Sequence, residues 1–186
     1  MRKLCRYHSK LTLFILWSVI TFTGHAEPIA TADEPKLRAA IVLGIIRYSN
    51  WPDDTKMAGQ LNVCSLGSPP SEQILTQVSG QHRYHDLSII THAIKDPSSS
   101  PFTCHALILG AQLDASTLQH WFATHDRHGL LTICDGCVLN TNPAMVTLVR
   151  RDNRIAFHVN LTQAKSADIT FRSALLELAL GVRNGQ

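Results

Sequence analysis

The sequence predicts an α/β fold, in which a mostly parallel sheet is flanked by helices and completed by an antiparallel C-terminal hairpin. Two observations support this prediction. Strand and helix patterns alternate from residue 61 to residue 136, which is typical of βαβ units. Further along the chain, two apolar strand patterns enclose the turn sequence Arg151-Asp152-Asn153, which is typical of a hairpin.

The first 26 residues have the three-part layout of a secretory signal peptide. Four basic residues precede an apolar run, and small residues lead to a cleavage site after Ala26. The apolar run is shorter than the roughly 20 residues that span a bilayer, so we expect a cleaved leader rather than a membrane anchor. Residues 27–186 should then form a single domain that is exported, most simply to a bacterial periplasm, without direct membrane insertion.

The long segment from Pro35 to Pro52 is predicted to be a helix. Its apolar residues recur at helical spacing, Pro35 suits a first helical turn, and Trp51-Pro52 ends the pattern. Beyond it, the patterns predict strands at 61–67, 86–94, 104–110 and 129–136, with helices at 71–80 and after a cap at Asp114 or Ser116. The hairpin should follow from residue 145, and two helices, at 161–168 and 171–182, should close the chain.

The charge balance argues against a nucleic-acid partner. The full chain has 17 Lys and Arg against 14 Asp and Glu, but the leader contains four of the positive charges and none of the negative ones. The exported chain is therefore nearly neutral, and the basic character comes from the leader.

A homodimer is a partner that the sequence leaves open.

The cysteine count predicts two disulfides. Cys5 leaves with the leader, and an even number of cysteines in an oxidising compartment favours disulfide pairing. Three pairings are open to the four remaining cysteines. Adjacency favours Cys134 with Cys137, which leaves Cys64 with Cys104.

The Cys134-Asp135-Gly136-Cys137 motif has two chemical alternatives. A catalytic dithiol would need a helix behind the motif, but the residues that follow contain Pro143 and lead into a strand. A zinc site would need further ligands, and the histidines, among them His125 and His128, are scattered and read as solvated loop residues. No nucleophile or phosphate-binding motif is present in the sequence, so we predict no enzyme, cofactor or metal. A thiol–disulfide protein and a small-ligand or metal-binding protein are the alternatives.

The exported chain resembles the YfiR family of periplasmic proteins. The resemblance covers residues 36–180 and lies in RAAIVLGIIRYSNWP, LNVCSLGSPP, CHALILG, GLLTICDGC and the C-terminal block 145–179. It implies two intramolecular disulfides, the first matching Cys64 and Cys104 and the second near Cys134 and Cys137. It also implies a function: binding the periplasmic sensing domain of an inner-membrane diguanylate cyclase, which lowers cyclic di-GMP and biofilm formation.

A protein of this kind acts through its surface. The C-terminal segment, residues 150–182, combines charged side chains with an apolar helix, as interfaces commonly do, although a helix packed on the sheet would show the same pattern. We predict that Arg154, Arg172 and Glu177 contact the partner. Large apolar residues usually face the core but can also serve an interface, and Trp51 is the interface candidate among Trp51, Trp121, Phe122 and Phe171.

Overall fold

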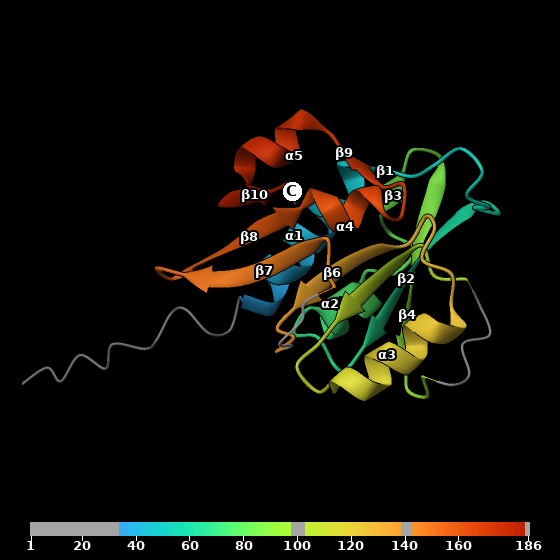
Figure 1. The fold of residues 1–186 in the computed structure, drawn as a ribbon, viewed down its shortest axis with the longest axis horizontal. Coiled ribbons are helices and arrows are strands. Elements are labelled where there is room, and N and C mark those ends of the chain that lie inside the picture. The colour runs from blue at the N-terminus through green and yellow to red at the C-terminus, as the bar shows by residue number, and fades with distance from the viewer. Residues whose placement is uncertain (1–33, 98–102, 139–142, 185–186) are drawn as a thin grey trace, which may run out of the picture.

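A computed structural model describes residues 34–97, 103–138 and 143–184; the predicted leader lies outside these residues. An eight-stranded sheet forms the centre of the molecule, with strand order β10-β8-β7-β6-β5-β2-β4-β3 (Figure 1). The strands of this sheet are β2 Gln60–Leu66, β3 Arg83–Tyr84, β4 Leu87–Ile94, β5 Ala106–Leu109, β6 Leu131–Asp135, β7 Val146–Arg151, β8 Arg154–Asn160 and β10 Gly181–Arg183.

The sheet is mostly parallel, as predicted. Strands β4, β2, β5, β6 and β7 run parallel to one another, and β10 runs parallel to β8. Only β3 with β4 and β7 with β8 pair antiparallel within this sheet. The β7–β8 pair is the predicted hairpin, and its turn falls between Arg151 and Arg154. It does not form the sheet edge, because β10 lies outside β8.

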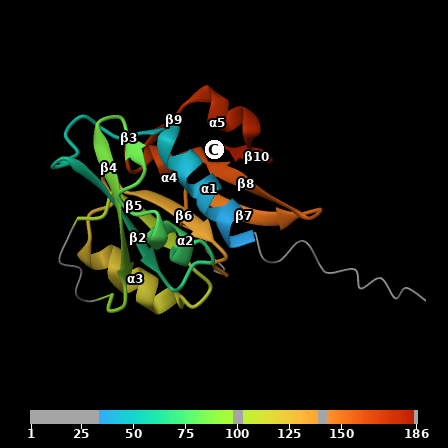
Figure 2. The same ribbon diagram turned by 180° about the vertical axis from the view of Figure 1, so that it is seen from behind.

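Helices cover the two faces of the sheet unequally. The helices are α1 Glu34–Arg47, α2 Glu72–Gln77, α3 Ala115–Thr124, α4 Leu161–Lys165 and α5 Ser173–Leu178. Figure 2 shows α1 and α2 on one face, and Figure 1 shows α3 on the opposite face, over the half of the sheet built from β2, β4 and β5. No described helix is long and apolar enough to cross a membrane.

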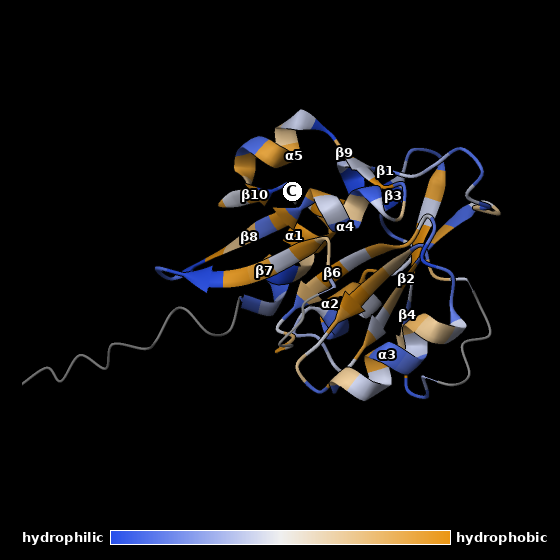
Figure 3. Ribbon diagram, viewed as in Figure 1, coloured by the Kyte–Doolittle hydropathy of each residue, from blue (hydrophilic) through white to orange (hydrophobic). Residues whose placement is uncertain are grey.

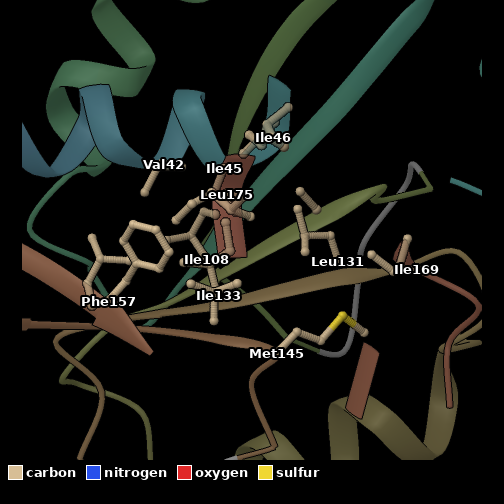
Figure 4. Packing of buried hydrophobic residues seen from close by; sticks show 14 of the residues in the cluster. Val42, Ile45, Ile46, Ile108, Leu131, Ile133, Met145, Phe157, Ile169 and Leu175 are labelled. Atoms are coloured by element: carbon tan, nitrogen blue, oxygen red, sulfur yellow. The ribbon is translucent and has the colours of Figure 1, made fainter. Parts of the chain in front are cut away.

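The strand period of two residues divides the core into two layers. Along β5, Ile108 belongs to the large cluster under α1, while Leu107 and Leu109 pack with Trp121 of α3. In the large cluster, Val42 and Ile45 of α1 lie over strand residues (Figure 4). The hydropathy colouring shows apolar strands in the centre of the sheet and a polar tip on the β7–β8 hairpin (Figure 3).

Two predicted helices end earlier than expected because the chain continues as a strand. The first ends at Arg47, because Ser49 and Asn50 form β1 and pair with β9, Thr170–Phe171. The last ends at Leu178, and the chain continues as β10 beside β8. In both cases pairing with a strand that is distant in sequence outweighs the local helical pattern. Asp114 caps α3 as predicted: its carboxylate accepts from Thr117 N at 2.7 Å.

Candidate partner-binding surface

The β7–β8 hairpin ends in an exposed, basic turn that projects from the body of the molecule (Figure 1). Asp152 and Asn153 have φ angles of 48° and 61°, the left-handed pair that suits a two-residue hairpin turn. Arg150 donates to the Asn153 side chain at 3.2 Å and pairs with Glu34 of α1 at 3.0 Å. The hairpin is thereby fixed beside the N-terminal end of α1.

Apolar side chains gather at the C-terminal end of the described chain. Leu175 of α5 is only 3% exposed and belongs to the large core cluster. Three of the five exposed large apolar residues in the described ranges follow it: Leu178 at 70%, Leu180 at 41% and Val182 at 40%. The predicted apolar helix therefore divides into a buried part and an exposed part, and the exposed part suits contact with another protein.

The four predicted partner-binding residues fall into different places. Arg154 starts β8 at the hairpin turn, and Glu177 is exposed on α5. Trp51 is half-buried, and its indole donates to the backbone carbonyl of His105 at 3.1 Å.

Trp51 and Arg172 both lie near Tyr84. The Trp51 and Tyr84 rings are 5.0 Å apart, centre to centre. Burial raises the pKa of Tyr84, and the positive charge of Arg172 opposes that shift. The structure thus places Trp51 and Arg172 in one neighbourhood, while the role of all four residues in binding stays a prediction.

Both predicted disulfides are present in the structure. Cys64 on β2 forms a disulfide with Cys104, which lies just before the start of β5. Their Cα atoms are 5.8 Å apart. Cys134 is joined to Cys137 with a Cα separation of 5.4 Å, and Gly136 between them has φ of 88°, which favours glycine. Cys134 is only 1% exposed and Cys137 is half-buried, so the short loop is a clasp at the end of β6 with one of its two cysteines buried.

The same loop holds a buried carboxylate. Asp135 is fully buried; one oxygen accepts from Arg38 of α1 at 2.7 Å, and the other accepts from Ser71 N at 2.9 Å. Arg38 also pairs with Glu34 at 2.8 Å. Burial acts to lower the pKa of Arg38, but its bonds to the two carboxylates outweigh burial and raise the pKa. Asp135 therefore ties β6 to α1 and to the start of α2.

The histidines make structural contacts. The buried His105 ring accepts from Asn62 N through Nδ1 at 2.8 Å, so Nε2 donates to the Lys56 carbonyl at 3.1 Å. The two ring nitrogens of His128 lie 2.9 Å from Asp54 and 3.1 Å from Asp168. Across the described ranges no group of three His, Cys, Asp or Glu residues is arranged to hold a metal ion.

A family model described as YfiR/HmsC-like matches residues 35–180. The chain belongs to the YfiR/HmsC-like family. A search of curated proteins found no match. The family match begins in the first turn of α1 and ends one residue before β10, so it includes α1, both disulfides and the hairpin. The family match suggests a periplasmic regulatory protein, which would act through the surface of the domain.

Sequence reasoning missed two features of this YfiR/HmsC-like domain. The first is the buried pair of Arg38 and Asp135, which are 97 residues apart in sequence. The second is the edge strand β10. Gly181 marks this strand, because a Cβ there would lie 3.2 Å from the His158 ring, and a glycine near the end of a predicted helix was the available signal.

Proposed function

We propose that the protein restrains an inner-membrane diguanylate cyclase by binding its periplasmic sensing domain, thereby lowering cyclic di-GMP and biofilm formation. The observation that carries this proposal is the YfiR/HmsC-like match over residues 35–180, which covers nearly all of the described domain. Binding can restrain the cyclase only if the protein favours the inactive conformation of the sensing domain over the active one.

The structural observations support a binding role. The Cys134–Cys137 pair, the best candidate for a reactive site, is a clasp with Cys134 buried. The C-terminal end of the described chain, by contrast, has three exposed apolar side chains, those of Leu178, Leu180 and Val182, and two exposed arginines, Arg172 and Arg183. Buried apolar centres with polar rims are the usual make-up of protein interfaces.

Periplasmic location is part of the proposal. Residues 1–26 have the layout of a leader, and two disulfides within one small domain suit an oxidising compartment. After cleavage, the domain would meet the sensing domain on the periplasmic side of the inner membrane.

Gene deletion tests the function in cells. Deletion should raise cyclic di-GMP and surface attachment, and complementation should reverse both. Arg154→Glu and Arg172→Glu, provided that each folds, should fail to complement. Lys95→Glu changes the charge of an exposed residue beyond β4 and should complement fully. Wild-type cyclic di-GMP in the deletion strain, with the cyclase expressed, would contradict the proposed function.

A further inference from the structure

An open cavity of about 640 Å³ lies at the amino ends of β5 and β6. We call it the α3 cavity, because the end of α3 forms one of its walls. His105 Nε2 donates to the Lys56 carbonyl at 3.1 Å, and the Asp54 carboxylate lies 2.9 Å from His128 Nε2. These contacts join three wall segments that are distant in sequence, namely residues 54–56, 103–105 and 121–128.

Two buried donors in these walls have no hydrogen-bond partner among the described residues. The ranges that the structure describes contain three buried side-chain atoms of this kind, and two of them, Trp121 Nε1 and Thr55 Oγ1, belong to residues that line the α3 cavity. Trp121 is 1% exposed, so folding removes its N–H from water. Folded proteins satisfy nearly all buried donors with protein, water or ligand atoms, because an unmade hydrogen bond is costly. Two such donors around one cavity indicate an acceptor that enters it.

The indole of Trp121 is held in a fixed orientation. The His125 ring is stacked on it, with the ring centres 4.1 Å apart and an angle of 2° between the planes. His125 Nδ1 lies 2.9 Å from the Trp121 backbone carbonyl, and because a carbonyl only accepts, Nδ1 donates. A donor that is already ordered loses little freedom when it binds an acceptor, which favours binding.

The charge that remains unpaired at the α3 cavity is positive. Lys56 is exposed and forms no ion pair with any residue of the described ranges. Both acids in the walls already bind His128: Asp54 contacts its Nε2, and Asp126 accepts from its backbone N–H at 3.0 Å. The groups available to a ligand are therefore an ammonium and two uncharged donors, which together favour an anion over a cation.

The dimensions of the α3 cavity favour a small molecule as its occupant. Small-molecule sites have volumes of about 300–1,000 Å³, whereas one water takes about 30 Å³. A water would also leave the Lys56 charge unpaired. Because Trp121 Nε1 and Thr55 Oγ1 are closed to solvent, a flat protein surface does not reach them, whereas an oxygen atom of a small ligand does after a slight movement of the lining.

We propose that the α3 cavity binds a small anion through carboxylate or phosphate oxygens. These oxygens accept from Trp121 Nε1 and from the Thr55 hydroxyl, and their charge pairs with the Lys56 ammonium. This inference goes beyond the proposed function, because the residues that line the α3 cavity are separate from the C-terminal segment 150–182.

The indole N–H signal of Trp121 reports binding directly in an NMR titration of ¹⁵N-labelled, disulfide-bonded protein. Residues 27–186 contain two tryptophans, and Trp51→Phe assigns their two indole signals. Trp51 is the internal reference, since its indole already donates to the His105 carbonyl. The probes are inorganic phosphate and succinate, each compared with sodium chloride at the same ionic strength. We expect the Trp121 signal to shift saturably with at least one probe and to stay in place with sodium chloride.

Lys56→Gln tests the role of the charge. It should bind that probe about 10-fold more weakly, because a hydrogen bond to a charged group is lost. Lys95→Gln is the matched control, since Lys95 is also exposed but lies beyond the carboxyl end of β4, and it should bind like the wild-type protein.

The two probes also distinguish the source of the anionic group. A response to phosphate alone would assign a phosphorylated ligand, a response to succinate alone would assign a carboxylate, and a response to both would support an oxyanion site shared by the two. The absence of a saturable Trp121 shift with either probe, or an equal shift with sodium chloride, would overturn the proposal. Equal affinity of Lys56→Gln and wild-type protein would also overturn it. All of these outcomes leave the proposed function intact, because gene deletion tests that function separately.

Discussion

Removing the charge of Arg38 should strongly destabilise the fold. Its side chain is 9% exposed and lies 2.7 Å from Asp135, whose side chain is fully buried. In Arg38→Met, the Asp135 carboxylate would keep its bond from Ser71 N at 2.9 Å but would lose its cation. Breaking one side of a buried ion pair costs about 3–5 kcal/mol. For a domain of this size, that corresponds to a melting temperature lower by about 6–20 °C.

Arg150→Met is the matched control, because Arg150 also pairs with Glu34, at 3.0 Å, but is 48% exposed. An exposed ion pair contributes about 1 kcal/mol or less. Urea unfolding, followed by circular dichroism with the disulfides intact, would give the free energy of unfolding for each variant. Arg38→Met/Asp135→Asn should recover part of the loss, since it removes the unpaired buried charge. If Arg38→Met and Arg150→Met lose equally little stability, the structural role assigned to the buried pair is wrong.

Three other predictions concern the disulfides and the buried histidine. Replacing Cys64 or Cys104 with Ser should lower the free energy of unfolding by about 4 kcal/mol, because the bridge closes a long loop; unchanged urea midpoints would exclude a stabilising bridge. The Cys134–Cys137 disulfide closes a short loop and so contributes less stabilisation through chain entropy. It should therefore be reduced first, and mass spectrometry after mild reduction should find Cys134 and Cys137 alkylated before Cys64 and Cys104. Earlier alkylation of Cys64 and Cys104 would contradict this order. Burial lowers the pKa of His105 below 6.5, so the unfolded chain binds a proton that the folded protein excludes. The free energy of unfolding, measured with urea, should therefore decrease as the pH falls below about 6.5, and it should decrease less in His105→Gln. The same pH dependence in both proteins would contradict this prediction.

The sequence predicted the central part of the fold because local patterns and tertiary structure agree there. The apolar run before Gly110 became β5, and the Arg151-Asp152-Asn153 turn became the hairpin turn. Asp114 caps α3 through the local bond that its position suggests. In these segments periodicity, turn chemistry and capping favour the same structure, so a single sequence was enough.

Prediction was incomplete where partners are distant in sequence. Ser49–Asn50 pair with Thr170–Phe171, and Gly181–Arg183 pair with β8, although both segments continue helical patterns. The carboxylate of Asp135 meets Arg38 for the same reason: only the folded sheet brings β6 to α1. For the surface, the sequence indicated the C-terminal segment but not the edge strand, because exposure of Leu180 and Val182 depends on β10 being the last strand.

The most direct test of the central claim is the rate of cyclic di-GMP synthesis by the purified full-length cyclase in lipid nanodiscs, where both sides of the membrane are accessible. GTP turnover would be measured as the disulfide-bonded protein is added, with a matched addition of Arg172→Glu. We expect the wild-type protein to lower the rate saturably, over the concentration range in which it binds the sensing domain, and Arg172→Glu to need a higher concentration. A turnover rate that stays constant while wild-type protein saturates the sensing domain would contradict restraint by binding.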